Sequence, residues 1–317
     1  MTDREAALVA VSRFWAETPE QRCQRALIAW MEHDHVRRYI NRRTTGDDAD
    51  DWLSYILRRY CDPPLERALS LGCGTGGLER HALASGCVKT FDACDVSEGA
   101  IESARAAAAE AGLGTRVDYS VADMNALDLG GARYDAVFAS MSVHHARELE
   151  HIFAELQRVL KPGGLVILNE YIGATRFHVP QVQLDLINDV LKILPVRLRH
   201  IISNGTTTDM IKDRYEVLTE EWFLRNDPSE AIRSAEIMPL LVKSFDIVGF
   251  KPYGGSLLHF LLENIVGNFD ESREDDRAWL EMVEYLELSV ERAGLLPSDF
   301  ALIVAAKRSE PPLVNPL

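Results

Sequence analysis

Short apolar runs alternate with amphipathic segments through most of the chain, and this alternation predicts its secondary structure. Five runs are typical of buried strands, at residues 68–71, 88–95, 116–121, 134–140 and 165–169. Between them lie segments with apolar residues at helical spacing, such as the one with Ile152, Leu156 and Leu160. Strands that alternate with helices predict an α/β fold with a mostly parallel sheet.

The segments outside this alternating core predict further helices and two late strands. We divide the chain into a helical N-terminal cap segment (1–61), a nucleotide-cofactor core (62–172), a helical lid (173–227), the rest of the core (228–307) with a helical insertion (255–293), and a tail (308–317). In these segments we expect helices near 6–15, 26–36, 52–57, 182–194, 228–243, 257–266 and 275–293, a polar loop at 203–209, and strands at 245–250 and 300–306.

A glycine-rich loop follows the first strand and opens a helix. Glycine allows the backbone to turn with positive φ and to approach a ligand, while the helix N-terminus presents free N–H groups. Gly72, Gly74 and Gly77 fit the G-x-G-x-x-G pattern of dinucleotide sites. Gly72, Gly74 and Gly76 fit a G-x-G-x-G pattern equally well. The loop therefore predicts a nucleotide cofactor without choosing between NAD and S-adenosylmethionine (SAM).

Carboxylates at the ends of the next two strands suit the rest of such a cofactor. Asp95 ends the second strand, where an acidic side chain can accept hydrogen bonds from ribose hydroxyls. Asp92 is the alternative, and Asp95 is preferred because it stands at the strand end. Asp123 and Met124 follow the third strand, and we expect the acid to bind an adenine amine and the thioether to pack on the ring.

These motifs, taken in order, resemble those of the class I SAM-dependent methyltransferases. The resemblance covers about residues 65–172, and it includes the His144-His145 pair after the fourth strand and the Lys161-Pro162-Gly163-Gly164 turn before the fifth. It implies a Rossmann-like sheet of seven strands, mostly parallel, with the last strand antiparallel. It also implies SAM as cofactor, bound by Gly72, Cys73, Gly74, Gly76, Asp95, Val96, Asp123, Met124 and Ser140. One position departs from the family, since its usual acid before the loop is Ser70 here.

Candidate catalytic residues follow the fourth and fifth strands. His144, His145 and Glu170 stand where an acceptor would meet the methyl group, and each type of side chain can remove a hydroxyl proton. The alternatives are that the histidines pack and bond on the cofactor side and that Glu170 pairs with an arginine such as Arg176.

Tyr171, Arg199 and His259 are the candidates for substrate binding. Tyr171 follows Glu170, and His259 follows a glycine turn at Gly254-Gly255, where a buried core histidine is the alternative. Arg199 belongs to a set of arginines that could anchor an anionic substrate or simply lie on solvated helix faces: Arg37, Arg38, Arg42, Arg43, Arg58, Arg59, Arg197 and Arg199.

Composition and charge narrow the function further. A net charge of -15 argues against a nucleic-acid partner, and the absence of Asn/Asp-Pro-Pro-Tyr/Phe after the fourth strand argues against methylation of nucleic-acid bases. Five cysteines without a C-x-x-C pair predict neither a disulfide framework nor a metal site. The chain has no apolar run of about 18 residues and no signal-peptide pattern, so we expect a cytoplasmic protein that does not bind membranes.

The resulting hypothesis is a SAM-dependent methyltransferase of a small or medium polar molecule, most readily at a hydroxyl oxygen of a sugar or natural product. N- or C-methylation of a metabolite and a catalytically silent SAM-fold scaffold are the alternatives. Anionic acceptors are included among the expected substrates, and a homodimer is left open.

Overall fold

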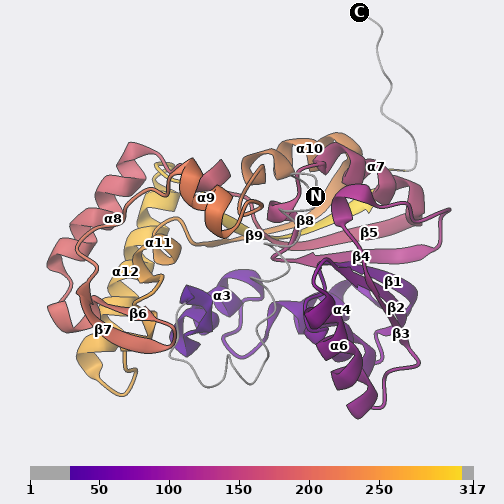
Figure 1. Cartoon of the computed structure of the whole chain (residues 1–317), viewed down its shortest axis with the longest axis horizontal. Coiled ribbons are helices and arrows are strands. Elements are labelled where there is room, and N and C mark those ends of the chain that lie inside the picture. The colour runs from indigo at the N-terminus through magenta and orange to yellow at the C-terminus, as the bar shows by residue number, and fades with distance from the viewer. Residues whose placement is uncertain (1–28, 309–317) are drawn as a thin grey trace, which may run out of the picture.

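The structure, a computed structural model, describes residues 29–308 and centres on one seven-stranded sheet (Figure 1). The strands are β1 Leu65–Leu71, β2 Val88–Asp95, β3 Val117–Val121, β4 Tyr134–Ser140, β5 Leu160–Tyr171, β8 Phe245–Gly254 and β9 Phe300–Lys307. Their order is β3-β2-β1-β4-β5-β9-β8. The pairs from β3 to β5 are parallel, and β9 runs antiparallel to both β5 and β8. The predicted Rossmann-like sheet with an antiparallel last strand is therefore confirmed.

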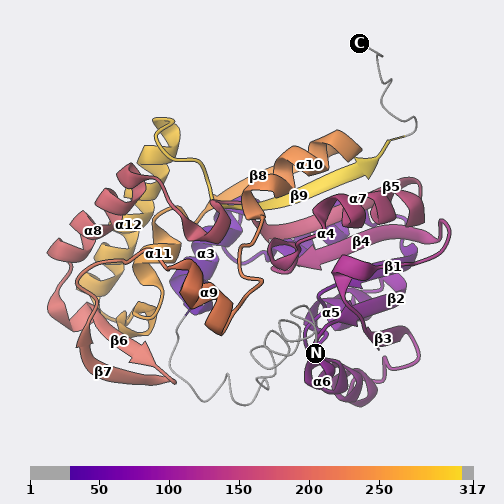
Figure 2. The ribbon, with the colours of Figure 1, turned by 45° about the horizontal axis from the view of Figure 1, so that its top comes forward.

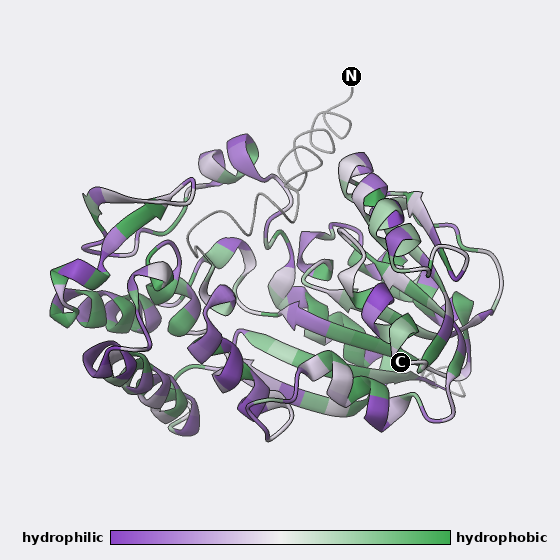
Figure 3. Ribbon diagram, turned by 90° about the horizontal axis from the view of Figure 1, so that it is seen from below, coloured by the Kyte–Doolittle hydropathy of each residue, from purple (hydrophilic) through white to green (hydrophobic). Residues whose placement is uncertain are grey.

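Helices cover both faces of this sheet. The helices around it are α4 Trp52–Tyr60, α5 Gly77–Ala84, α6 Glu98–Glu110, α7 Leu149–Val159 and α10 Ile237–Ser244. Side chains of α4, α5 and α6 form one buried cluster with the strands, and those of α7 and α10 form another. The strands are consequently largely hydrophobic, whereas the helices carry polar outer faces (Figure 3). Burial on both faces explains why β4 is apolar almost throughout instead of alternating.

A second group of helices packs beside the sheet around its own hydrophobic cluster (Figure 2). It comprises α3 Asp34–Thr44, α8 Gln181–Ile193, α9 Glu220–Asn226, α11 Leu258–Leu262 and α12 Glu274–Arg292, with a hairpin of β6 His200–Ser203 and β7 Thr206–Ile211. Buried residues from four of these helices share one cluster, including Val36, Ile187, Leu258 and Leu280. We call this group the cap.

Several predicted elements differ in the structure. The predicted polar loop at 203–209 is a β-hairpin, because its run of threonines pairs with β6 around an Asn204-Gly205 turn. The predicted helix at 228–243 begins only at Ile237, since Asp227 accepts a hydrogen bond from Ser229 N in a local turn. The predicted helix at 257–266 is limited to α11, followed by a 3-10 turn at Val266–Asn268.

The N-terminal prediction is tested only in part. The predicted helix at 6–15 lies outside the described residues, as do the first three residues of the one at 26–36. The described part of the latter is not one helix, because a 3-10 turn at Trp30–Glu32 ends at His33, whose backbone is extended, and α3 begins at Asp34. The predicted helix at 52–57 is present as α4. No helix within residues 29–308 combines the length and apolarity needed to cross a bilayer.

Candidate active site

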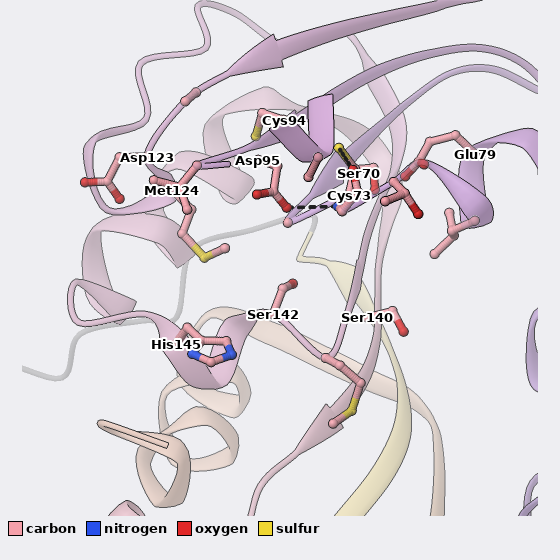
Figure 4. Close-up of a pocket in the computed structure, with 18 of the residues that line it drawn as sticks. Ser70, Cys73, Glu79, Cys94, Asp95, Asp123, Met124, Ser140, Ser142 and His145 are labelled. Atoms are coloured by element: carbon pink, nitrogen blue, oxygen red, sulfur yellow. Dashed lines mark hydrogen bonds between the residues drawn. The ribbon is translucent and has the colours of Figure 1, made fainter. Parts of the chain in front are cut away.

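A cavity of about 390 Å³ lies at the carboxyl ends of β1, β2 and β4, against the glycine loop (Figure 4). We call it the loop cavity. Every predicted cofactor residue except Gly76 lines it, namely Gly72, Cys73, Gly74, Asp95, Val96, Asp123, Met124 and Ser140. Open parallel sheets place their ligands at this edge.

The loop's glycines are required by its shape. Gly72, Gly74 and Gly76 have φ of 64°, 52° and 75°, in the left-handed region. A Cβ on Gly72 would lie 2.4 Å from Ser142 Cβ, and one on Gly76 would lie 2.3 Å from the Tyr119 hydroxyl. Gly76 thus serves the packing of the loop on β3 and does not itself face the cavity.

Asp95, and not Asp92, faces the loop cavity. Its Oδ2 accepts a hydrogen bond from Gly74 N at 2.8 Å, and its Oδ1 accepts one from Ser97 N at 2.8 Å. Asp92 instead pairs with Arg67 at 2.7 Å, and neither of these two residues lines the cavity. Each Asp95 oxygen keeps a second lone pair for a ligand.

Asp123 and Met124 line the end of the loop cavity that lies away from Ser70 and Glu79 (Figure 4). Asp123 Oδ1 accepts hydrogen bonds from the backbone and side-chain nitrogens of Asn125, both at 2.9 Å. These bonds fix the turn that follows β3 and leave a carboxylate beside a thioether on the wall.

A second and larger cavity, of about 1060 Å³, lies between the sheet and the cap. We call it the cap cavity. Its wall includes seven aromatic residues, namely Trp30, Tyr171, Phe177, Tyr215, Trp222, Phe260 and Phe300. Its polar side chains include His144, Lys212, Glu230, His259 and Glu263.

The two cavities are separated by a thin wall in which neighbouring residues face opposite sides. His145 and Ser229 line the loop cavity, whereas His144 and Glu230 line the cap cavity. Met141, whose φ is 52°, lines both. The wall is therefore the place where ligands in the two cavities would meet.

Glu170 holds His144 in this wall from behind. Glu170 is fully buried and lines neither cavity. Its Oε2 accepts hydrogen bonds from Ser142 N at 2.9 Å and Val143 N at 2.7 Å, and its Oε1 bonds Tyr171 N and His144 Nδ1. The structure therefore does not bring Glu170 to a cavity wall, where we expected it to contact an acceptor, because both of its oxygens bond groups inside the protein.

His144 carries a positive charge at neutral pH. Burial alone would lower the pKa of its imidazole, but the Glu170 carboxylate, helped by Glu230 and Asp227, raises this pKa to about 9. His144 Nε2 lies 3.6 Å from Glu230 Oε1, on the cap-cavity side. Burial and the charge of His144 push the pKa of His145 well below its ordinary value, and its Nδ1 lies 3.0 Å from Ser229 Oγ.

Comparison with known proteins identifies the family. A family model described as "Methyltransferase domain" matches residues 68–164. The 27-O-demethylrifamycin SV methyltransferase of Amycolatopsis mediterranei is 33% identical over 228 residues, which cover 69% of this chain and 82% of that enzyme. The chain belongs to the class I SAM-dependent methyltransferases. SAM is accordingly its cofactor.

Other similarities are more partial. The 24-methylenesterol C-methyltransferase 2 of Oryza sativa subsp. japonica is 31% identical to this chain over 115 residues. These residues are 36% of this chain and only 31% of the rice enzyme. A solved geranyl diphosphate methyltransferase in complex with GPP and sinefungin covers 95% of this chain with a TM-score of 0.54 at 15% identity. That structural match shows a shared fold alone.

The residues of the loop cavity fit SAM on chemical grounds. The cofactor presents an adenine, a ribose diol, a sulfonium and an amino-acid group. The cavity of this methyltransferase offers a thioether and a carboxylate at one end, Asp95 midway, and a buried carboxyl group at the other.

Tyr171 and His259, two of the three residues expected to bind substrate, both line the cap cavity. The Tyr171 hydroxyl donates to Ala174 O at 2.9 Å, so its ring is what faces the cavity. His259 is held in place by the glycine turn, whose backbone N–H groups at Gly255, Leu257 and Leu258 all donate to the buried Glu287 carboxylate. Burial, with Lys212 and His144 nearby, lowers the pKa of His259 to about 3, so this imidazole is neutral.

Arg199 is the predicted substrate residue that the structure places elsewhere. It lines neither cavity, and its guanidinium bonds Asp213 at 2.5 Å and Leu194 O at 3.1 Å. Six of the other seven predicted arginines pair with carboxylates, namely Arg37, Arg38, Arg42, Arg43, Arg58 and Arg197, and Arg59 lies over the Tyr60 ring, 6.0 Å from its centroid. Arg176 bonds the Pro228 and Glu230 carbonyls and not Glu170. Local helix and cap packing explains this set of arginines.

His144, His145 and Glu230 offer one ligand atom each within 4.8 Å of one another, a donor set that could hold a divalent cation. In the structure the charged His144 lies between Glu170 and Glu230, so its proton already balances these carboxylates. A cation would have to displace this proton.

Sequence reasoning missed several residues of the site, including Ser229 of the wall. Glu230 and Met141 belong to the wall, and Glu79 lines the loop cavity. Glu230 stands near the start of the segment predicted as a helix at 228–243, and nothing in the pattern of that segment indicated the wall. Glu79 did carry a signal, since it is an acid on the buried face of the helix that opens at the glycine loop.

Proposed function

We propose that this methyltransferase methylates a hydroxyl oxygen of a mainly apolar small molecule bound in the cap cavity. The observation that carries the proposal is the placement of His144. This imidazole lines the cap cavity and lies in the wall next to the loop cavity. It is oriented by the carboxylate of Glu170, whose oxygens contact only groups inside the protein. A histidine oriented by a carboxylate is a suitable general base for an alcohol.

The step proceeds by an in-line displacement. SAM supplies an electrophilic methyl group on a positively charged sulfur. As the acceptor oxygen forms its bond to the methyl carbon and the carbon–sulfur bond breaks, the hydroxyl proton passes to His144 Nε2. The electron pair of the broken bond stays on sulfur, which becomes a neutral thioether. The protein's largest contribution is to hold the two reactants in line across the wall.

His144 must lose its resting proton before it can accept one from the acceptor. Its pKa of about 9 makes the neutral form a minority at neutral pH. We therefore expect the rate to rise with pH until His144 is deprotonated.

The lining of the cap cavity favours a neutral acceptor with an extensive apolar surface. Aromatic and aliphatic side chains together supply more than half of the lining residues. The Lys212 ammonium is committed to the carbonyls of Phe260, Leu261 and Glu263, and Arg214 pairs with Glu216 at 3.0 Å. These cations are engaged, so the cavity lining does not support the anionic acceptor that the arginines suggested.

The cofactor roles are assigned by chemistry and position in the loop cavity. Asp95 would accept from the ribose hydroxyls, and Asp123 and Met124 would bind the adenine. Gly72 and Gly74, with Cys73, Val96 and Ser140, would form the remaining wall. The similarity to a named rifamycin O-methyltransferase supports oxygen as the methylated atom, and the sterol C-methyltransferases support the carbon alternative.

The test is to identify the product. The protein is incubated with SAM carrying a ¹³C-methyl group and with matched aromatic or polyketide-like scaffolds that bear a hydroxyl or, at the same position, an amine. A methoxy carbon in the NMR spectrum of the product supports the proposal, together with a rate that rises with pH. An N-methyl or C-methyl product would refute it. The His144→Gln variant should lose most of the O-methylation rate while binding SAM as before.

A further inference from the structure

Glu79 is a buried carboxyl group without a partner in the wall of the loop cavity. It lies in the first turn of α5, Gly77–Ala84, and its side chain has no solvent-exposed surface. It lines the cavity, yet neither of its oxygens makes a hydrogen bond within residues 29–308. A buried carboxyl group without partners is costly, which points to a ligand that supplies them.

Glu79 lies beside the position at which this chain departs from its family. The family's usual acid before the glycine loop is replaced by Ser70, which is buried and lines the same cavity. Figure 4 shows Ser70 and Glu79 together at one end, with Asp95 between them and the Asp123–Met124 end. An acid is thus present at this end, but it comes from α5 instead of β1.

The surroundings hold Glu79 close to neutrality. Burial raises the pKa of its carboxyl group to about 7, and the nearby Ser70 hydroxyl, its own backbone and Arg80 offset only part of this rise. The Ser70 hydroxyl is close but does not have hydrogen-bond geometry to either oxygen. The titratable groups that face Glu79 are Cys73 of the loop, Arg80 of α5, Cys94 and Asp95 of β2, and Tyr119 of β3.

We propose that the Glu79 carboxylate binds the α-ammonium group of the methionine moiety of SAM, in place of the acid that Ser70 has replaced. This inference rests on the proposed cofactor orientation, with adenine at Asp123 and ribose at Asp95. The amino-acid group then lies at the opposite end, where Glu79 is the acid without a partner among the described cavity residues. An ammonium group there satisfies the carboxylate by charge and hydrogen bonding.

Binding of the ammonium group must then be linked to loss of a proton from Glu79. The free protein carries this proton below pH 7, and the ligand favours the ionised form. The ligand's amine stays charged in this range, because an α-amino group ordinarily titrates near pH 8. Affinity for the amino-acid end should therefore rise with pH up to about 7 and fall above about pH 8, where the ligand's amine loses its charge.

The first test uses the wild-type protein and two ligands. S-adenosylhomocysteine carries the amino-acid group, whereas 5′-methylthioadenosine has the same adenosine and thioether without it. Calorimetry at pH 6.5 in buffers of different ionisation enthalpy counts the protons released. We expect ~0.75 proton for S-adenosylhomocysteine at pH 6.5, falling toward zero near pH 7.5, where release from Glu79 and uptake by the ligand's amine balance, and none for 5′-methylthioadenosine.

The second test moves the acid. Glu79→Gln should weaken S-adenosylhomocysteine binding by roughly tenfold to a hundredfold, as expected for a charged hydrogen bond, and should leave 5′-methylthioadenosine binding unchanged. Adding Ser70→Asp to Glu79→Gln should restore much of the lost affinity, because the acid returns to the strand end.

Two outcomes would overturn the proposal. Equal proton release for both ligands would assign the proton to another group, and this result needs no variant. Equal loss of both ligands in a folded Glu79→Gln protein would make Glu79 a packing residue. Failure of the wild-type protein to bind 5′-methylthioadenosine would instead overturn the adenosine placement on which the proposal rests. The product test described above is independent of all three results.

Discussion

Replacing Glu170 with glutamine should change the protonation of His144 more than any other single substitution. The carboxylate of Glu170 is the main reason that the pKa of His144 is raised despite complete burial. Glutamine keeps the shape but removes the charge. Burial then dominates, and the pKa of His144 should fall from about 9 to its ordinary value near 6.5 or below.

The raised pKa of His144 also makes the free energy of unfolding depend on pH. A folded-state pKa raised from 6.5 to about 9 stabilises the native state by about 3 kcal/mol, fully present below pH 6.5 and lost as the pH rises through 9. Thermal unfolding of the wild-type protein should therefore show this loss between pH 6.5 and 9.5, and the Glu170→Gln variant should lack it. The variant also weakens the charged hydrogen bonds to Ser142 N and Val143 N, so it should be less stable at pH 6.

The direct assay is NMR titration of ¹⁵N-labelled imidazoles. We expect the His144 signal to titrate near pH 9 in the wild-type protein and at least two units lower in Glu170→Gln. Glu230→Gln is the matched control, because its carboxylate lies farther away, at 3.6 Å, and should change the His144 pKa much less. A His144 pKa in Glu170→Gln within one unit of the wild-type value would refute the electrostatic account.

Three further predictions concern the loop cavity and the cap. Asp95→Ala should weaken S-adenosylhomocysteine binding by about 2–3 kcal/mol in calorimetry, whereas Asp92→Ala should not, and the reverse result would move the ribose contact to Asp92. Gly72→Ala should abolish most cofactor binding because its Cβ would meet Ser142, while Gly46→Ala, with similar positive φ and open space, should bind normally; equal binding by both would show that the loop can adjust. Leu191→Ala should lower the free energy of unfolding by about 2–5 kcal/mol in urea, and a change below 1 kcal/mol would contradict the tight packing of the cap.

The cofactor half of the site was predictable from local patterns. Positive-φ glycines, a strand-end acid and an acid followed by a thioether all lie within a few residues of the strand that positions them. Asp95 could be preferred to Asp92 because the end of a strand in a parallel sheet has a fixed location. The antiparallel direction of β9 was expected from the family resemblance and not from these local patterns.

The arrangement of the wall and the cap cavity depends on contacts between segments that are distant in the sequence. Local sequence patterns do not predict such contacts. Glu170 and His144 are 26 positions apart, and their contact turns Glu170 from a candidate that touches an acceptor into a positioning residue. Arg199 stands in a basic run that indicated anion binding, yet Asp213 of the following hairpin arm neutralises it. Glu79 was not predicted, because a glutamate in the first turn of a helix is usually exposed and interacts favourably with the helix dipole.

The division of labour across the wall has a consequence for how acceptor choice can diversify. Apart from Met141 and His144, every residue that lines the cap cavity lies outside residues 68–164, the part that matches the methyltransferase domain. Under the proposed function, exchange of the cap segments between relatives should change acceptor preference and leave the cofactor residues in place. Such chimeras must keep the wall between the two cavities intact, and the wall consists of few residues: Met141, His144, His145, Ser229 and Glu230.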